Sequence, residues 1–205
     1  MRGPVFRGLI LTLAFSLLMS APPAAAENPQ QVVKGVADEV VRILSDPALQ
    51  GPAHKDRRLQ LIKNTIERRF DFEEMAKRSL GTSWGKLGGA QRSEFVGVFK
   101  EVLEASYADK FEKYSGEKIN FLGESRDGEY AEVRTVLMRK NDRIPMNYRL
   151  LNKSSWKVYD VEIEGVSLVG NYRSQFSQIM SQSGYGELVR RLRTRAGELR
   201  RSGGV

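Results

Sequence analysis

The sequence predicts an α+β fold in which helices precede and follow one antiparallel sheet. Apolar residues recur at helical spacing through residues 32–114, a pattern typical of amphipathic helices. Between residues 119 and 163 the apolar period changes to two, and helical spacing returns after Gly165. Short turns separate the predicted strands, so neighbouring strands should be antiparallel. We therefore expect N-terminal helices, a four-stranded curved sheet and two C-terminal helices.

Three helices are expected in the N-terminal part. The first covers residues 32–44 and ends at the turns that contain Pro47 and Pro52. The second runs from about residue 54 to residue 70. The third ends near residue 80, and Asp71 with Glu74 three residues later resembles a capping box at its start.

A glycine-rich loop and a long helix follow. Residues 81–89 contain four glycines and Trp84, whose large side chain we expect to insert into the body of the protein. The next helix spans residues 90–114 and carries a stripe of apolar residues spaced four apart: Phe95, Phe99, Leu103, Tyr107 and Phe111. Each step of four drifts about 40° around a helix, so the stripe should wind and be buried on much of its circumference.

Four strands are expected at residues 119–122, 130–139, 144–151 and 156–163. On the third strand the even-numbered positions from Ile144 to Leu150 share one face. On the fourth, Trp156, Val158 and Asp160 should share one face by the same alternation.

The C-terminal part begins where Gly165 ends the last strand. Ser167 is placed to cap the following helix, which should end near Gly184 and Gly186. A last helix is expected over residues 188–199, and residues 202–205 are expected to form a disordered tail.

The first 26 residues are expected to be a secretory signal. Arg2 and Arg7 precede an apolar stretch at residues 9–19, and Ala24–Ala26 provide a cleavage site, with cleavage expected after Ala26. Residues 27–201 should then form a single domain. The chain has no cysteine, so it has no disulfide framework, and a bacterial periplasm is the simplest destination.

The sequence offers little of the chemistry that catalysis or metal binding requires. The single histidine, His54, lies at the expected start of a helix, where a surface or capping role is favoured. Asp160, Glu162 and Glu164 alternate along one strand, where carboxylates are normally solvated or paired with a cation. Asp160 lies beside apolar positions, so we expect it to be paired with Arg149 or Arg173. No catalytic residue, metal site or cofactor is predicted.

The formal net charge of +8 could suit nucleic acid, anionic lipid or an acidic partner, and export makes nucleic acid the least favoured. Two interpretations of the arginines near the C-terminus stay equally open: a solvated helix face, or a docking surface for anionic headgroups or an acidic protein. These arginines are Arg190, Arg191, Arg193, Arg195, Arg200 and Arg201.

Two blocks of the sequence resemble a known family. The first contains Leu80-Gly81, Trp84, Gln91-Arg92, the aromatic stripe and Tyr114-Ser115-Gly116, and the second runs from Trp156 to Phe176. Together they are similar to the MlaC or toluene-tolerance family, the periplasmic phospholipid-binding component of the Mla ABC transport system. The likeness extends over residues 32–192, and residues 85–89 depart from it because a more basic, proline-containing loop is usual there.

The resemblance implies a cystatin-like or NTF2-like α+β shape with a deep apolar cavity between a curved sheet and the helices. It also implies a carrier that is not an enzyme and that holds a glycerophospholipid by its acyl chains. The implied partners are an inner-membrane MCE-domain protein with its ABC transporter and an outer-membrane lipoprotein complex. We expect a monomer that does not bind nucleic acid.

The apolar residues on elements that should face one another are expected to line this cavity. They are Phe99, Leu103, Tyr107, Val136, Met138, Met146, Tyr148, Leu150, Val158 and Phe176. Structural roles are expected for Trp84, Trp156, Asp160, Gly165, Ser167 and Arg173. Three alternatives remain: a carrier of another apolar lipid such as a hopanoid, an enzyme of NTF2-like shape that uses Asp160, and an adaptor without a ligand that docks through the arginine helix.

Overall fold

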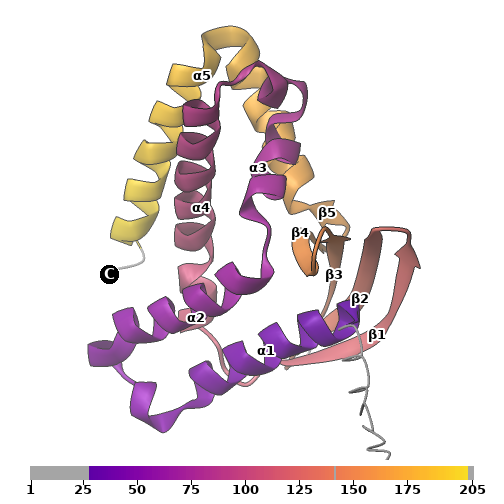
Figure 1. Ribbon diagram of the computed structural model, residues 1–205. Helices are drawn as coiled ribbons and strands as arrows, with labels where there is room; N and C mark the ends of the chain where they lie inside the picture. The colour runs from indigo at the N-terminus through magenta and orange to yellow at the C-terminus, as the bar shows by residue number, and fades with distance from the viewer. Residues whose placement is uncertain (1–27, 141, 203–205) are drawn as a thin grey trace, which may run out of the picture.

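The computed structural model describes residues 28–140 and 142–202. The predicted signal segment, residues 1–26, and residues 203–205 of the predicted tail lie outside the described residues. Within these described residues the fold consists of five α-helices and one antiparallel sheet (Figure 1). The helices are α1 (Pro29–Ser45), α2 (Lys55–Arg69), α3 (Phe72–Leu80), α4 (Gly89–Glu112) and α5 (Leu168–Ser202), with 3-10 turns at Pro47–Leu49, Pro52–His54 and Gly81–Lys86.

Helices α1 and α2 form a hairpin along the base of the molecule in Figure 1. Asn28 caps α1 by accepting a hydrogen bond from the Gln31 amide at 2.7 Å, so the helix begins three residues earlier than the apolar spacing predicted. Arg58 of α2 is buried and donates twice to the carboxylate of Glu112, each at 2.7 Å, which fixes α2 against the end of α4. His54 is exposed at the N-cap of α2.

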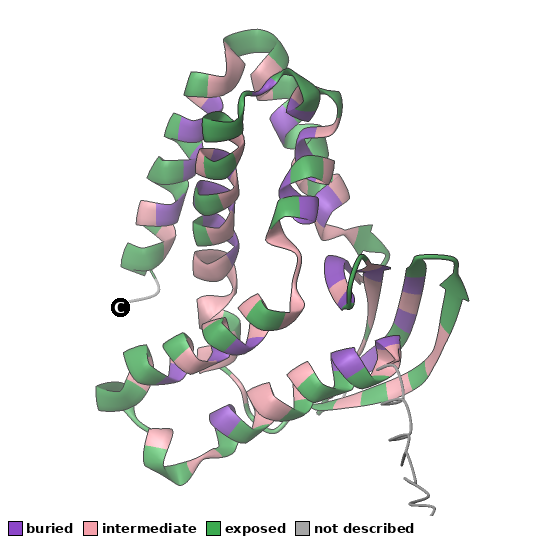
Figure 2. Cartoon of the chain, viewed as in Figure 1, coloured by how far each residue is buried: buried purple, intermediate pink, exposed green. Residues whose placement is uncertain are grey.

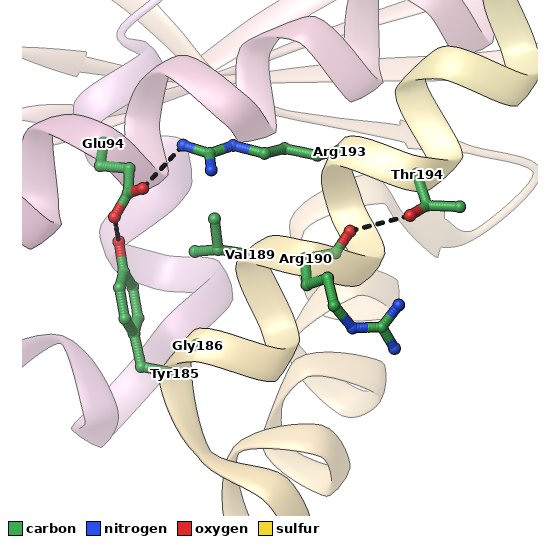
Figure 3. A pocket seen from close by; sticks show the side chains of 7 residues that line it. All are labelled: Glu94, Tyr185, Gly186, Val189, Arg190, Arg193 and Thr194. Carbon is green, nitrogen blue, oxygen red and sulfur yellow. Dashed lines mark hydrogen bonds and ion pairs between the residues drawn. The ribbon is translucent and has the colours of Figure 1, made fainter.

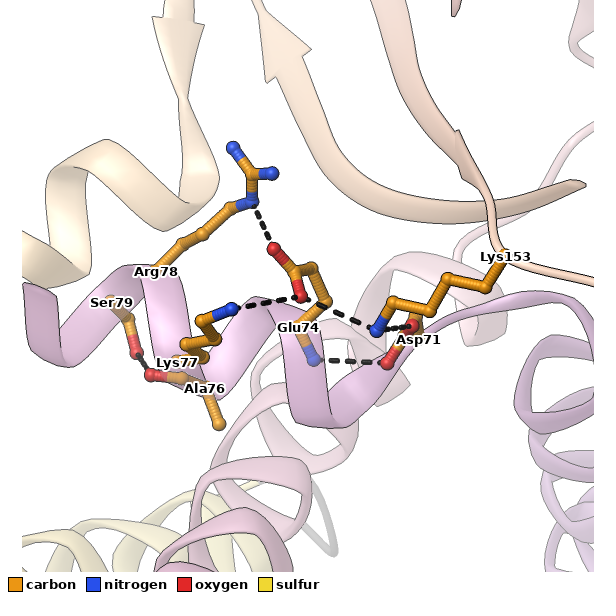
Figure 4. A network of polar contacts seen from close by, with 7 residues as sticks. All are labelled: Asp71, Glu74, Ala76, Lys77, Arg78, Ser79 and Lys153. Carbon is orange, nitrogen blue, oxygen red and sulfur yellow. Dashed lines mark hydrogen bonds and ion pairs between the residues drawn. The ribbon is translucent and has the colours of Figure 1, made fainter. Parts of the chain in front are cut away.

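Helix α3 is held against the turn between strands β3 (Asp142–Asn152) and β4 (Trp156–Ile163) by the polar network of Figure 4. Asp71 caps the helix by accepting from the Glu74 amide at 2.9 Å, as the sequence predicted. The Glu74 carboxylate is buried and accepts from Arg78 Nε at 2.8 Å and from Lys153 Nζ at 3.3 Å. Lys153 also donates to Asp71 at 3.0 Å. A buried carboxylate with several cationic donors is compensated, so this contact stabilises the position of α3.

The two predicted C-terminal helices are the two arms of α5. Gly184 has φ 77° and ψ −178°, outside helical geometry, and the chain reverses there so that both arms lie against α4 (Figure 1). Phe176 of the first arm packs edge-on against Phe95 and Phe99 of α4, with ring centroids 5.7 and 5.6 Å away. Leu188 of the second arm is fully buried in the same core.

The sheet has the strand order β1-β2-β3-β4-β5, with every neighbouring pair antiparallel. Its strands are β1 (Lys118–Asp127), β2 (Tyr130–Arg139), β3 (Asp142–Asn152), β4 (Trp156–Ile163) and β5 (Val166–Ser167). The four predicted strands are therefore present, and a two-residue fifth strand follows them. β1 continues five residues past the predicted end. The prediction stopped too early because the second half of the strand is polar and shows no apolar alternation.

Two β-bulges interrupt the pairing and decide which way side chains point. In β1 the register shifts between Phe121 and Gly123, so Leu122 is the extra residue. In β4, Val158 pairs with Leu150 while Asp160 pairs with the adjacent Arg149. Tyr159 is therefore the extra residue there. The expectation that Val158 and Asp160 share a face was wrong, because this bulge turns Asp160 to the opposite side.

The buried residues form three clusters. The largest joins α3, α4 and both arms of α5, a second lies between α1 and one face of the sheet, and a third holds the α1–α2 hairpin together. Buried and exposed positions alternate along the helices, as Figure 2 shows. In the part of the chain that the structure describes, no helix has both the length and the apolar character that crossing a bilayer requires.

Candidate functional site

The candidate site is the sheet face that packs against α1, which we call the inner face. Direct pairing across the strands places Val133, Tyr148 and Val161 in one row and Ala131, Leu150 and Val158 in the next. Val32 and Val33 of α1 are buried against these rows. The inner face is thus a continuous apolar surface that spans β2, β3 and β4.

Several large side chains on the inner face remain half-buried. Met146, Tyr148, Ile163 and Phe121 pack against the buried cluster, yet each keeps accessible surface. The Tyr148 hydroxyl donates to Met146 Sδ at 3.0 Å, and burial raises the pKa of Tyr148 to about 12. The hydroxyl therefore lies in an apolar environment although its side chain is still reachable from outside.

Phe70 joins the inner face to the helical core. It packs against both the sheet cluster and the cluster of α3, α4 and α5, and its ring stacks on Phe72 with 6.2 Å between centroids. The backbone holds it in place, because the Asp71 amide donates to the Val158 carbonyl at 2.8 Å. The α2–α3 junction therefore runs along β4 where the two apolar clusters meet.

The ten predicted lining residues fall into three groups. Phe99, Leu103 and Phe176 lie in the helical core, and Tyr107 is half-buried further along α4. Met146, Tyr148, Leu150 and Val158 lie on the inner face.

Val136 and Met138 form the third group and do not lie on the inner face. They pair with Pro145 and Arg143, so they project from the other side of the sheet, which we call the outer face. The ten predicted lining residues therefore do not share one face of the sheet. Glu132 and Arg134 lie on the same face of β2 as Val136 and Met138, because alternate residues of a strand share a face. These two charged residues are the sequence signal that could have assigned this face to the outside and Val133 to the inner face.

Asp160 connects the outer face of β4 to the start of α5. Its carboxylate is buried and accepts from Ser167 Oγ at 2.6 Å and from the Val169 amide at 3.0 Å. Ser167 Oγ in turn accepts from the Gly170 amide at 2.9 Å, which is an N-cap interaction. A carboxylate at a helix N-terminus is also stabilised by the helix dipole, so this group fixes α5 to the sheet.

The cation near Asp160 is Arg149, and Arg173 lies elsewhere. Arg149 Nη1 is 3.5 Å from Asp160 Oδ2, and its Nη2 donates to Glu162 at 2.6 Å. Arg173 is exposed and packs its guanidinium over Gly81, where φ is 55° and a Cβ would lie 3.0 Å from Arg173 Nε. Arg149 is the partner because it lies directly opposite Asp160 in the pairing of β3 with β4. Spacing along the sequence does not reveal which residues of two strands lie opposite each other.

The remaining structural candidates are in strained or buried positions. Trp84 is buried in the helical core beneath the guanidinium of Arg92, 5.3 Å from its ring centroid. Trp156 is buried on the inner face. Gly165 has φ 79° in the turn between β4 and β5, a conformation that favours glycine.

A pocket of about 400 Å³ lies outside these surfaces, between α4 and the second arm of α5 (Figure 3). Glu94 accepts there from the Tyr185 hydroxyl at 2.8 Å and from Arg193 at 2.7 Å. Burial and the hydrogen bond to Glu94 raise the pKa of Tyr185. The charged side chains that line the pocket are already paired, so we assign it to holding the arm of α5 in place.

The arginines of α5 are largely engaged in ion pairs. Arg190 and Arg191 both contact Glu187, at 2.6 and 2.7 Å. Arg193, Arg195 and Arg200 contact Glu94, Glu198 and Glu101. This arrangement favours the solvated helix face over the docking surface for this cluster.

Known proteins resemble this chain along most of its length. The family model described as MlaC protein matches residues 34–194. The intermembrane phospholipid transport system binding protein MlaC of Haemophilus influenzae is 26% identical over 200 residues, which cover 92% of each chain. The toluene tolerance protein ttg2D of Pseudomonas putida is 25% identical over 182 residues, which cover 87% of this chain and 83% of that protein.

A solved structure shares the fold. The phospholipid-binding protein of Ralstonia solanacearum, determined in complex with a phospholipid, matches with a TM-score of 0.76 and 27% sequence identity. The match covers 85% of this chain and 99% of that chain. Because the family model matches well over half of the sequence, this chain belongs to the MlaC family.

Proposed function

We propose that this protein is a phospholipid carrier that holds acyl chains against the inner face of its sheet. The observation that carries the proposal is the likeness in fold and sequence to a protein solved with a phospholipid bound. The half-buried inner-face residues support it, since Tyr148 combines an apolar environment with accessible surface. These two properties are expected of a residue that lines a recess for an apolar ligand.

We further propose that the carrier works in the periplasm and exchanges lipid with membrane-bound partners. The expected partners are an inner-membrane MCE-domain protein with its ABC transporter and an outer-membrane lipoprotein complex. Removing an acyl chain from water is worth about 0.8 kcal/mol per methylene, which is on the order of 10 kcal/mol per chain. Such a complex releases lipid slowly by itself, so delivery requires a docked partner that offers an equally apolar path.

The polar seam between sheet and helix has a separate role in this proposal. Asp160, Ser167 and Arg149 use their hydrogen-bonding groups on one another and on the backbone of α5. They hold the scaffold that surrounds the lipid and do not contact it. A substitution in this seam therefore changes stability more than lipid selectivity.

The test is organic extraction of the purified protein followed by mass spectrometry. We expect about one glycerophospholipid per chain, and a protein without any such lipid would overturn the proposal. A hopanoid or another apolar lipid in the extract would assign the same site to a different cargo.

Two methionines provide a matched pair of variants for this test. Met146 and Met138 are both half-buried, but they lie on the inner and the outer face respectively. Met146→Glu puts a charge into the apolar site and should lower the lipid content at least about tenfold, because burying an unpaired carboxylate is costly. Met138→Glu lies between Lys118 and Arg143 and should leave the lipid content unchanged. Equal lipid loss in both variants would contradict the assignment of the inner face.

A further inference from the structure

The outer face of the sheet carries cations that lack carboxylate partners. Lys118, Met138 and Arg143 form one cross-strand row on β1, β2 and β3, and Arg134 lies four residues away on β2. All three cations are exposed, and within the described residues none of them forms an ion pair. Neighbouring strands are about 4.8 Å apart, so Lys118 and Arg143 lie about 10 Å apart across Met138, and Arg134 lies about 13 Å along β2 from that row.

An exposed leucine lies on the same face. Leu122 is the extra residue of the β1 bulge, and together with Gly123 it opposes Arg134. Both residues of such a bulge project to the same side as the residue that they oppose. Leu122 is 60% exposed, the largest exposed fraction of the large apolar side chains in the described residues.

The helical core covers one end of this outer face. There Leu151 and Tyr159 join the core of α3, α4 and α5, and the Arg78 guanidinium lies 4.0 Å from the Tyr159 ring centroid. Lys118, Arg134 and Arg143 lie on β1, β2 and β3, which are separated by β4 from β5 and the start of α5, and all three side chains are exposed. This part of the sheet is therefore free to contact another surface.

We propose that this basic outer face, formed by Lys118, Leu122, Arg134 and Arg143, docks the protein onto the surface of an anionic lipid bilayer. Charge complementarity selects the occupant, because the three cations need anions and phospholipid headgroups present many of them side by side. Leu122 fits the same occupant, since a single protruding apolar side chain enters the headgroup region without needing a shaped pocket. The inference goes beyond the proposed function, because lipid can be carried without direct contact with a bilayer.

The expected effect follows from the number of charges. Each Lys or Arg near an anionic surface strengthens binding about fivefold, so neutralising three should weaken it about a hundredfold. Losing the Leu122 side chain should by itself weaken vesicle binding about tenfold, given the transfer free energy of a leucine. Both effects should be visible at low ionic strength, and the electrostatic part should shrink as salt is added.

The experiment is vesicle flotation with the exported protein as purified after secretion. One set of vesicles contains phosphatidylglycerol and phosphatidylcholine in equal parts, and the other contains phosphatidylcholine alone. The test variants are the triple substitution Lys118→Gln, Arg134→Gln, Arg143→Gln and, separately, Leu122→Ser. Circular dichroism verifies that each variant is folded.

The matched control removes the same number of charges from α5. Arg191→Gln, Arg195→Gln and Arg200→Gln leave the same net charge as the outer-face triple, but these arginines are already paired with carboxylates. The proposal expects the wild type and this control to float with the phosphatidylglycerol vesicles and the outer-face triple to remain behind. Equal loss in both triples would overturn it, because net charge alone would then explain binding.

A wild type that ignores both kinds of vesicle would also overturn the proposal, and an acidic protein partner would become the better occupant of this face. Lipid extraction keeps this result separate from the carrier function. The outer-face triple should retain its co-purified phospholipid, because none of its substitutions touches the inner face. Loss of that lipid would show that the triple had disturbed the scaffold.

Discussion

The helical core and the inner face of the sheet are both rich in large apolar residues, but they are packed differently. In the helical core, Phe95 and Phe99 are fully buried and stack with 5.8 Å between centroids, and Phe176 closes over both. On the inner face, Tyr148 and Phe121 keep accessible surface. The first three residues of the apolar stripe, Phe95, Phe99 and Leu103, therefore provide solid core, whereas the less conspicuous strand residues provide surface that a ligand can reach.

This difference separates stability from ligand binding. A fully buried ring contacts protein on all sides, so its removal leaves a cavity that the core cannot fill. A half-buried ring on the inner face contributes less to folding in the absence of lipid. The same kind of substitution should thus have opposite consequences for stability and for lipid content in the two regions.

Phe99→Ala should break the helical core and have the largest effect. Phe99 is fully buried and contacts Phe95, Tyr172 and Phe176. The free energy of unfolding should fall by about 3 to 5 kcal/mol, as for other large-to-small changes of a buried aromatic residue. Urea denaturation of the delipidated protein measures this loss.

Phe121→Ala is the matched substitution on the inner face. We expect less than half of the stability loss of Phe99→Ala in delipidated protein, together with a clear fall in co-purified lipid. Equal stability losses at the two positions would show that the inner face is packed as tightly as the helical core, and the comparison would fail.

The pH dependence of stability should sharpen the assignment of Tyr148. Its pKa is raised by burial to about 12 from an ordinary value near 10. The unfolded chain therefore releases this proton first, and the stabilisation present below pH 10 is lost as the pH rises toward 12. The loss should be about 2 to 3 kcal/mol over that window.

Tyr148→Phe has no proton to release, so its unfolding midpoint should fall less than that of the wild type between pH 10 and pH 12. Parallel curves would contradict the apolar environment of this hydroxyl.

Features that depend on local chemistry could be predicted from the sequence. Asp71 and Ser167 cap α3 and α5 because an N-cap needs only a side-chain oxygen and the following amides. Gly184 interrupts α5 near the expected end of the first C-terminal helix, and Gly165 takes a positive φ in the turn after β4. Each of these interactions lies within a few residues along the chain.

Features that depend on pairing between strands could not be predicted in the same way. The bulge at Tyr159 exists only relative to β3, and it reverses the side to which Asp160 points. The choice of Arg149 over Arg173 follows from the same register. Phe99 becomes solid core because Tyr172 and Phe176 of α5 pack against it, which the periodicity of α4 alone does not reveal.

Asp160→Asn should loosen the seam that connects the two regions. The carboxylate is buried and accepts two hydrogen bonds from the start of α5, with Arg149 nearby. Losing the charge at this position should cost about 2 kcal/mol, the usual scale for a hydrogen bond to a charged group. Thermal unfolding measures the cost, and lipid content should be retained. Loss of lipid without loss of stability would instead assign Asp160 to the ligand.

Ser167→Ala should have the smallest effect because it removes one hydroxyl from the same seam. That hydroxyl accepts from the Gly170 amide and donates to Asp160, so its loss leaves the first turn of α5 without its cap. We expect a decrease of about 1 kcal/mol in the free energy of unfolding, which is typical of an N-cap serine. Ser174→Ala on the exposed side of the same helix is the control, since Ser174 donates only to the Gly170 carbonyl at 3.3 Å. If both variants lose the same stability, the cap does not hold α5 to the sheet, and the carboxylate of Asp160 must do so through the Val169 amide alone.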